Sequence, residues 1–82
     1  METIIFEDKD ICIKKTNKNY DFIATIQNKS NRDLYIDFTN EKMEYNDDTI
    51  IVQAQDWIGI LADEKGYEFL QKLENRDFYI NA

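Results

Sequence analysis

The chain has 82 residues and a formal net charge of −7, with 43% hydrophobic residues, 11 aromatic residues and one cysteine. The length suits one domain over residues 1–82, and the apolar and aromatic content argues against a disordered chain. One cysteine excludes an internal disulfide, the N-terminus has no signal-peptide pattern, and no apolar run is long enough to span a membrane. We therefore expect a cytoplasmic protein.

The first half of the chain alternates apolar and polar side chains with a period of two, which is typical of half-buried antiparallel strands. The inward-facing residues are predicted to be Ile4 and Phe6, Ile11 and Ile13, then Tyr20, Phe22, Ala24 and Ile26, and finally Leu34, Ile36 and Phe38. The polar segment 28–32 has the length of a hairpin loop. It is predicted to join two paired strands.

A fifth strand is predicted at 49–54, after a polar segment at 40–48. Asp56 is a favourable helix N-cap, so a short helical turn is expected over 57–61. Gly59 would weaken that turn by about 1 kcal/mol relative to alanine.

The main helix is predicted within 63–74, because Asp63 suits its N-terminus and apolar residues then recur at helical spacing. Phe69, Leu70 and Leu73 form the predicted buried stripe, Asn75 is expected in the left-handed cap position, and 78–80 resembles a last strand.

Together these elements predict an α+β fold, with an antiparallel sheet of five to six strands, one C-terminal helix on one face and a short terminal strand. The alternative is a small curled barrel. The face away from the helix would hold Ile5, Cys12, Ile23, Tyr35 and Ile51. So apolar a face needs a cover, which could be a curled sheet, a second copy or a partner.

Several kinds of chemistry are closed to this chain. It has no histidine, one serine and two glycines, so nucleophile–histidine pairs and glycine-rich phosphate loops cannot be built. We expect no enzymatic activity, no cofactor and no metal. Cys12 is expected to be inert and partly buried. Trp57 is expected to fill the core or a hinge, or else to be a hot spot for a partner.

The net charge is concentrated in the middle of the chain, since residues 33–64 contain nine acids and one base. The candidate partner-binding residues there are Asp33, Tyr35, Asp37, Glu41, Glu44, Asp47 and Asp48. Carboxylates arrayed in this way can imitate nucleic-acid phosphates, and they repel nucleic acid and anionic membranes. The alternative is that the charge serves only solubility.

We therefore expect a non-enzymatic protein-binding module that engages a basic, nucleic-acid-binding surface of a partner, as an inhibitor or immunity protein would. The abundance of Ile, Lys and Asn, which have AT-rich codons, favours a bacterial or phage source. The alternative is an accessory domain that forms a homodimer through its apolar reverse face. No motif in the chain identifies a family.

Overall fold

A computed structural model of the chain describes residues 3–16, 21–38 and 49–81. The elements, in chain order, are β1 (Thr3–Glu7), β2 (Ile11–Lys15), β3 (Phe22–Asn28), β4 (Leu34–Phe38), β5 (Thr49–Val52), β6 (Trp57–Leu61), α1 (Glu64–Glu74) and β7 (Phe78–Asn81). This order confirms the predicted α+β class, the single C-terminal helix and the terminal strand. The predicted polar segment at 40–48 lies outside the described residues.

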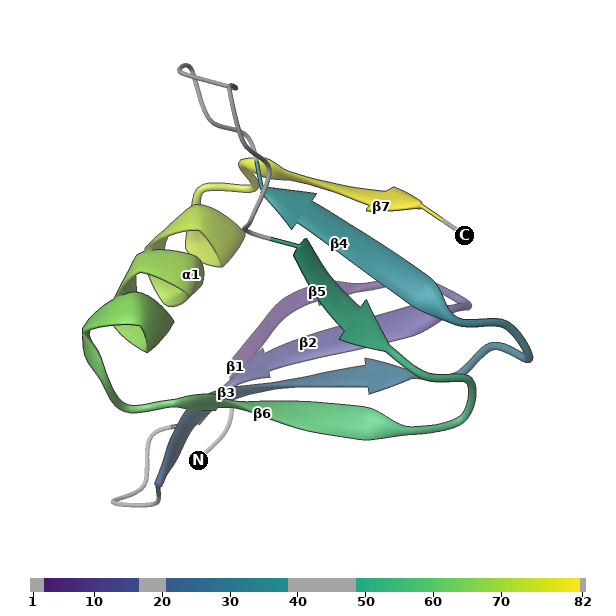
Figure 1. The fold of residues 1–82 in the computed structure, drawn as a ribbon, viewed down its shortest axis with the longest axis horizontal. Coiled ribbons are helices and arrows are strands. Elements are labelled where there is room, and N and C mark those ends of the chain that lie inside the picture. Colours follow the sequence, from purple (N-terminus) through teal and green to yellow (C-terminus); the bar gives the residue numbers. More distant parts are fainter. Residues whose placement is uncertain (1–2, 17–20, 39–48, 82) are drawn as a thin grey trace.

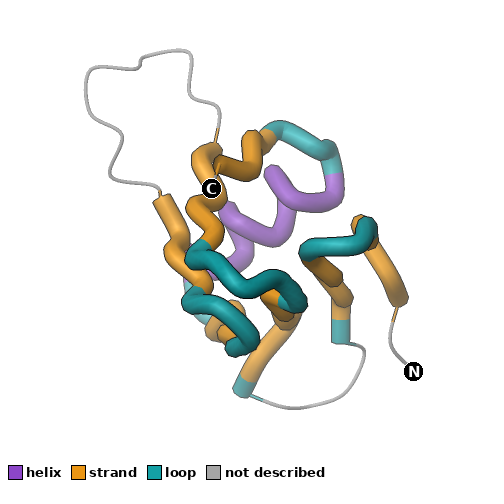
Figure 2. The backbone as a smooth tube through the Cα atoms, turned by 90° about the vertical axis from the view of Figure 1, so that its right-hand side faces the viewer, coloured by secondary structure: helices purple, strands orange, loops and turns teal. Residues whose placement is uncertain are grey.

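The strands form two antiparallel sheets instead of one. The four-stranded sheet has the order β1-β2-β3-β6, the three-stranded sheet has the order β5-β4-β7, and neither closes into a barrel. The helix α1 lies at one end of the two sheets (Figure 1). The loops at the opposite end lie in front of α1 in the perpendicular view (Figure 2).

The chain crosses between the sheets after β3, after β5 and again through α1. The prediction of a hairpin at 28–32 is therefore wrong, because β3 pairs with β2 and β6 whereas β4 pairs with β5 and β7. Gln55, whose φ of 61° turns the second crossover, donates from Nε2 to the carbonyl oxygens of Lys29 and Ser30, each at 2.9 Å. The first two crossovers are thus bonded to each other.

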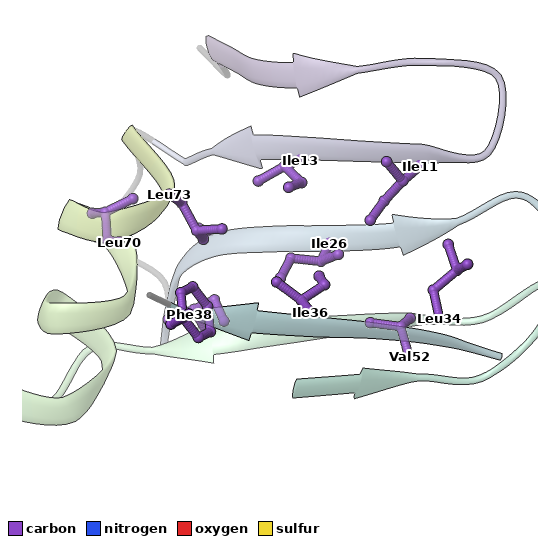
Figure 3. Close-up of a cluster of buried hydrophobic side chains, with 11 residues drawn as sticks. Ile11, Ile13, Ile26, Leu34, Ile36, Phe38, Val52, Leu70 and Leu73 are labelled. Atoms are coloured by element: carbon purple, nitrogen blue, oxygen red, sulfur yellow. The ribbon is translucent and has the colours of Figure 1, made fainter. Parts of the chain in front are cut away.

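The core lies between the two sheets and against α1 (Figure 3). Its buried side chains are Ile11, Ile13, Ala24, Ile26, Leu34, Ile36, Phe38, Val52, Ile60, Leu70 and Leu73. Leu70 and Leu73 are buried, as predicted, and Phe69 stacks on Phe38 with ring centroids 4.8 Å apart. The helical stripe thus closes one end of the core.

Two β-bulges change the predicted faces of the four-stranded sheet. The register shifts between Ile4 and Phe6 and again between Phe22 and Ala24, so one extra residue is inserted at each point. Because side chains alternate along a strand, an extra residue moves everything beyond it to the other face. Ile4 and Phe22 therefore face outward, contrary to prediction, whereas Ile5 and Ile23 pack against the core.

Residues 57–61 form the edge strand β6, and the predicted helical turn there is wrong. Ile58 and Ile60 alternate inward and pair with Ile26 and Ala24 of β3, burying their side chains. The free edge of β3 supplies hydrogen bonds that a helical turn of this length could not match.

The two ends of α1 are capped by different means. Asp63 is the N-cap, as predicted, and its Oδ1 accepts a hydrogen bond of 2.7 Å from the amide of Gly66. At the other end the left-handed residue is Arg76, with φ of 59°, and not Asn75. The amide of Asp77 donates to the carbonyl of Lys72 at 2.9 Å, which completes a Schellman cap around Arg76.

No helix of the described residues is long and apolar enough to cross a bilayer.

Candidate functional site

The outer face of the three-stranded sheet carries the described part of the predicted site. Two rows of side chains cross it in register, one made of Ile51, Tyr35 and Asn81 and the other of Thr49, Asp37 and Tyr79. The opposite side chains of β4 are buried in the core. We call these six residues the Asp37 face.

Asp37 holds the centre of this face with a fixed carboxylate. Its Oδ1 accepts a hydrogen bond of 2.6 Å from Oγ1 of Thr49, and its Oδ2 accepts one of 2.6 Å from Nδ2 of Asn81. One donor lies on each neighbouring strand, so the carboxylate bridges all three strands. It therefore links the strands of the sheet and also places a negative charge at the surface.

Three large side chains surround the carboxylate and remain open to solvent. Tyr79 is 65% exposed, Ile51 53% and Tyr35 38%. Exposed single hydrophobic residues are ordinary, but three on adjacent strands form one apolar surface. An apolar surface with one oriented charge has the composition of a binding face.

Asp33 has a structural role next to this face. It lies just before β4, and its Oδ1 accepts a hydrogen bond of 3.0 Å from the amide of Ala54 in the second crossover. The carboxylate is exposed, but it holds the two crossovers together.

The structure thus places Tyr35 and Asp37 on one face, with Asp33 at its edge. The other predicted site residues, Glu41, Glu44, Asp47 and Asp48, lie outside the described residues. Thr49, Tyr79 and Asn81 also belong to this face and were not predicted from the sequence. The position of Tyr79 between Phe78 and Ile80 is a signal that it points away from the core, but nothing in the sequence showed that β7 pairs with β4.

The charges on the two sheets differ. The strands of the three-stranded sheet contain no lysine or arginine, and Asp37 is their only charged residue. Residues 3–16 and 21–32, which build most of the four-stranded sheet, contain five basic and four acidic residues. Of the two sheets, the three-stranded one therefore carries the charge that is less repulsive to a basic group.

Cys12 and Trp57 both lie on the outer face of the four-stranded sheet, in one register row. Cys12 is only 3% exposed, and its burial, with a hydrogen bond to Glu7, raises the pKa of its thiol. Trp57 is 53% exposed, so the expectation that it fills the core or a hinge is wrong.

The predicted apolar reverse face is not assembled. Ile5 and Ile23 pack against the core, whereas Tyr35 and Ile51 belong to the other sheet. Among the described residues no three histidine, cysteine, aspartate or glutamate side chains gather as metal ligands.

Comparison with protein-family models, with curated proteins and with solved structures finds no match. Fold and face together define an acidic α+β protein with two antiparallel sheets and one exposed aromatic–carboxylate face.

Proposed function

We propose that the protein is a non-enzymatic module that binds a basic protein surface through the Asp37 face. One observation carries the proposal: Tyr35, Ile51 and Tyr79 are exposed around an oriented carboxylate, on a sheet whose strands contain no basic residue.

The chemistry of this face suits an arginine of the partner. A guanidinium group pairs with a carboxylate and stacks on aromatic rings, and it loses less hydration than an ammonium group does. Tyr79 lies directly across from Asp37 on β7, and Tyr35 lies two residues away on β4. Thr49 and Asn81 already hold the carboxylate in place, so binding requires little further ordering.

In this proposal the partner surface is one that normally binds nucleic acid, because carboxylates can occupy the places of phosphates. The protein would then act as an inhibitor or immunity protein in the cytoplasm of a bacterium or its phage. The large excess of acidic residues, 17 against 10, supports attraction to such a surface over long range.

Affinity capture from the native host at two salt concentrations tests the proposal, with variants that separate the face from the net charge. Tyr79→Ser and Asp37→Asn should release the partner, and so should raising the salt from about 0.05 to 0.5 M, which shortens the Debye length several-fold. Tyr67→Ser is the matched control, because Tyr67 is 56% exposed on α1 and lies outside the Asp37 face.

Capture that survives both Tyr79→Ser and Asp37→Asn would overturn the proposal. Sedimentation of the purified protein examines the rival function, a homodimer. A dimer lost on Ile51→Ser would assign this face to self-association and leave the charge as a solubility device.

A further inference from the structure

The outer face of the four-stranded sheet contains a hollow of about 300 Å³, lined by Cys12, Lys14, Thr25, Gln27 and Trp57. Two register rows meet there. One runs through Glu7, Cys12, Gln27 and Trp57, and the other through Ile4, Lys14, Thr25 and Gly59. The hollow therefore lies on the central strands β2 and β3, with Trp57 on the edge strand as its wall.

The indole of Trp57 is held in place although half of it is exposed. The ring of Phe22 contacts it edge-on, with centroids 6.0 Å apart and an interplanar angle of 87°. Phe22 in turn lies over Gly59, where a Cβ atom would come 2.7 Å from Phe22 Cε1 and closer still to Cγ and Cδ1. The missing side chain of Gly59 thus makes room for the ring that supports Trp57.

Three polar side chains line the hollow, namely Lys14, Thr25 and Gln27. Within the described residues the side chains of Lys14, Thr25 and Gln27 make no hydrogen bond or ion pair. The nearby Glu7 is paired with Lys29 at 3.3 Å, so among the described residues the ammonium of Lys14 has no carboxylate partner. The floor of the hollow is also uncharged at neutral pH, because the buried Cys12 thiol keeps its proton.

We propose that this hollow binds a small flat aromatic molecule carrying one carboxylate or phosphate, with its ring against Trp57 and its anion at Lys14. Aromatic stacking and a cation at the rim supply complementary contacts, and Thr25 and Gln27 supply hydrogen bonds. The volume is at the lower end of small-molecule sites, which suits one ring system and not a polymer. The site is independent of the Asp37 face, which lies on the other sheet.

The chain contains one tryptophan, so the indole N–H of Trp57 gives a unique signal in a nitrogen–proton correlation spectrum. Titration with adenosine monophosphate and with benzoate should shift this signal together with the amides of Thr25 and Gln27. Adenosine and benzyl alcohol, which lack the anion, should bind about tenfold more weakly, and inorganic phosphate alone should not shift the indole. Binding of only the nucleotide assigns a phosphate ligand, and binding of only benzoate assigns a carboxylate ligand.

Lys14→Gln should lower the affinity for the anionic probe about tenfold, to that of its neutral analogue. Lys9→Gln, which removes a charge from the exposed turn before β2, should leave the affinity unchanged. Trp57→Leu should weaken both probes about tenfold through lost stacking, read from the amides of Thr25 and Gln27. The remaining signals of each variant report its folding.

Three outcomes would overturn the proposal. The first is the absence of any shift with either anionic probe. The second is equal affinity for the charged and the neutral probe. The third is an equal loss of affinity in Lys9→Gln and Lys14→Gln, which would mean that only the net charge matters.

Discussion

Asn28 is buried at the end of β3, where it joins the two sheets. Its Nδ2 donates to the carbonyl oxygens of Val52 and Arg32, at 2.9 and 2.8 Å, and its Oδ1 accepts from the amide and the hydroxyl of Ser30. All four hydrogen-bonding positions of the side chain are therefore used. A polar group so fully satisfied fixes one arrangement of the strands.

Asn28→Asp should destabilise the fold by about 3–5 kcal/mol at neutral pH, because it places a charge where two carbonyl oxygens now receive hydrogen bonds. Burial would raise the pKa of the new carboxyl group above its unfolded value, so the defect should shrink as the pH falls and the group takes up a proton. Urea unfolding across that range measures this. Gln53→Glu, an equal change of charge at an exposed position, should cost far less.

Cys12 should be unreactive in the folded protein. Burial and the neighbouring Glu7 raise the pKa of its thiol, and only the thiolate is nucleophilic. Because the folded-state pKa is above the unfolded one, proton binding favours the folded state, and this contribution is lost as the pH rises past roughly 8.5. Alkylation should be much faster in urea than in buffer. The alkaline loss of stability should be smaller in Cys12→Ala, and an unchanged loss there would contradict the assignment.

At the scale of elements, the bulges explain what the sequence could and could not predict. The period-two pattern correctly located the first five strands, because apolar alternation depends on burial and not on pairing. It assigned Ile5 and Ile23 to the wrong face, because a bulge leaves no mark on a pattern of apolar residues that continues through it. The pattern also failed at β6, where the free edge of β3 outweighed a local N-cap signal at Asp56.

Gly59→Ala should destabilise β6 by about 1–3 kcal/mol, because the added methyl group overlaps the ring of Phe22. The displaced ring should also shift the fluorescence of Trp57. In the background of Phe22→Leu, which lowers the steric demand, the same change should cost less. A double-mutant cycle measures this coupling, and additive effects would show that the glycine serves another purpose.

At Gly66 we expect replacement of glycine by alanine to change the free energy of unfolding in the direction opposite to that usual in a helix. Alanine usually favours a helix over glycine by about 1 kcal/mol. Here a Cβ atom would overlap the carbonyl oxygen of Leu61, in the backbone of β6, so Gly66→Ala should lower the unfolding free energy instead. Lys65→Ala, one residue earlier on the exposed side, provides the comparison in thermal unfolding.

At the scale of the whole molecule, α1 contributes to the core of both sheets by closing one end of it (Figure 3). Leu73 is fully buried and Leu70 nearly so. Leu73→Ala should lower the free energy of unfolding by about 2–5 kcal/mol, because the side chain is fully buried in the core cluster and its removal leaves a cavity. Tyr67→Ala, on the exposed side of the same helix, should cost little. Chemical denaturation compares the two variants. Similar losses of unfolding free energy would mean that α1 stabilises the fold through its helix propensity and not through core packing.

The candidate site was predictable only in part, because its residues come from strands that are distant in the sequence. The segment 33–37 showed from its alternation that Tyr35 and Asp37 share an outward face. That Tyr79 and Asn81 complete this face depends on β7 pairing with β4, which joins residues more than 40 positions apart. A contact that distant leaves no periodic trace in a single sequence.

The interleaved strand order also determines how the chain must fold. The strands β1, β2 and β3 can pair with their neighbours in sequence, but β3 gains its second partner only after two strands of the other sheet have been synthesised and crossed. The second partner of β4 comes later still in the sequence, because it is β7, the last of the described strands. The entropy lost in closing such large loops is not offset until the distant strands pair. We therefore expect folding on a scale of milliseconds to seconds. With no proline in the chain, no slow isomerisation phase should follow, and the fluorescence of Trp57 should report a single refolding event.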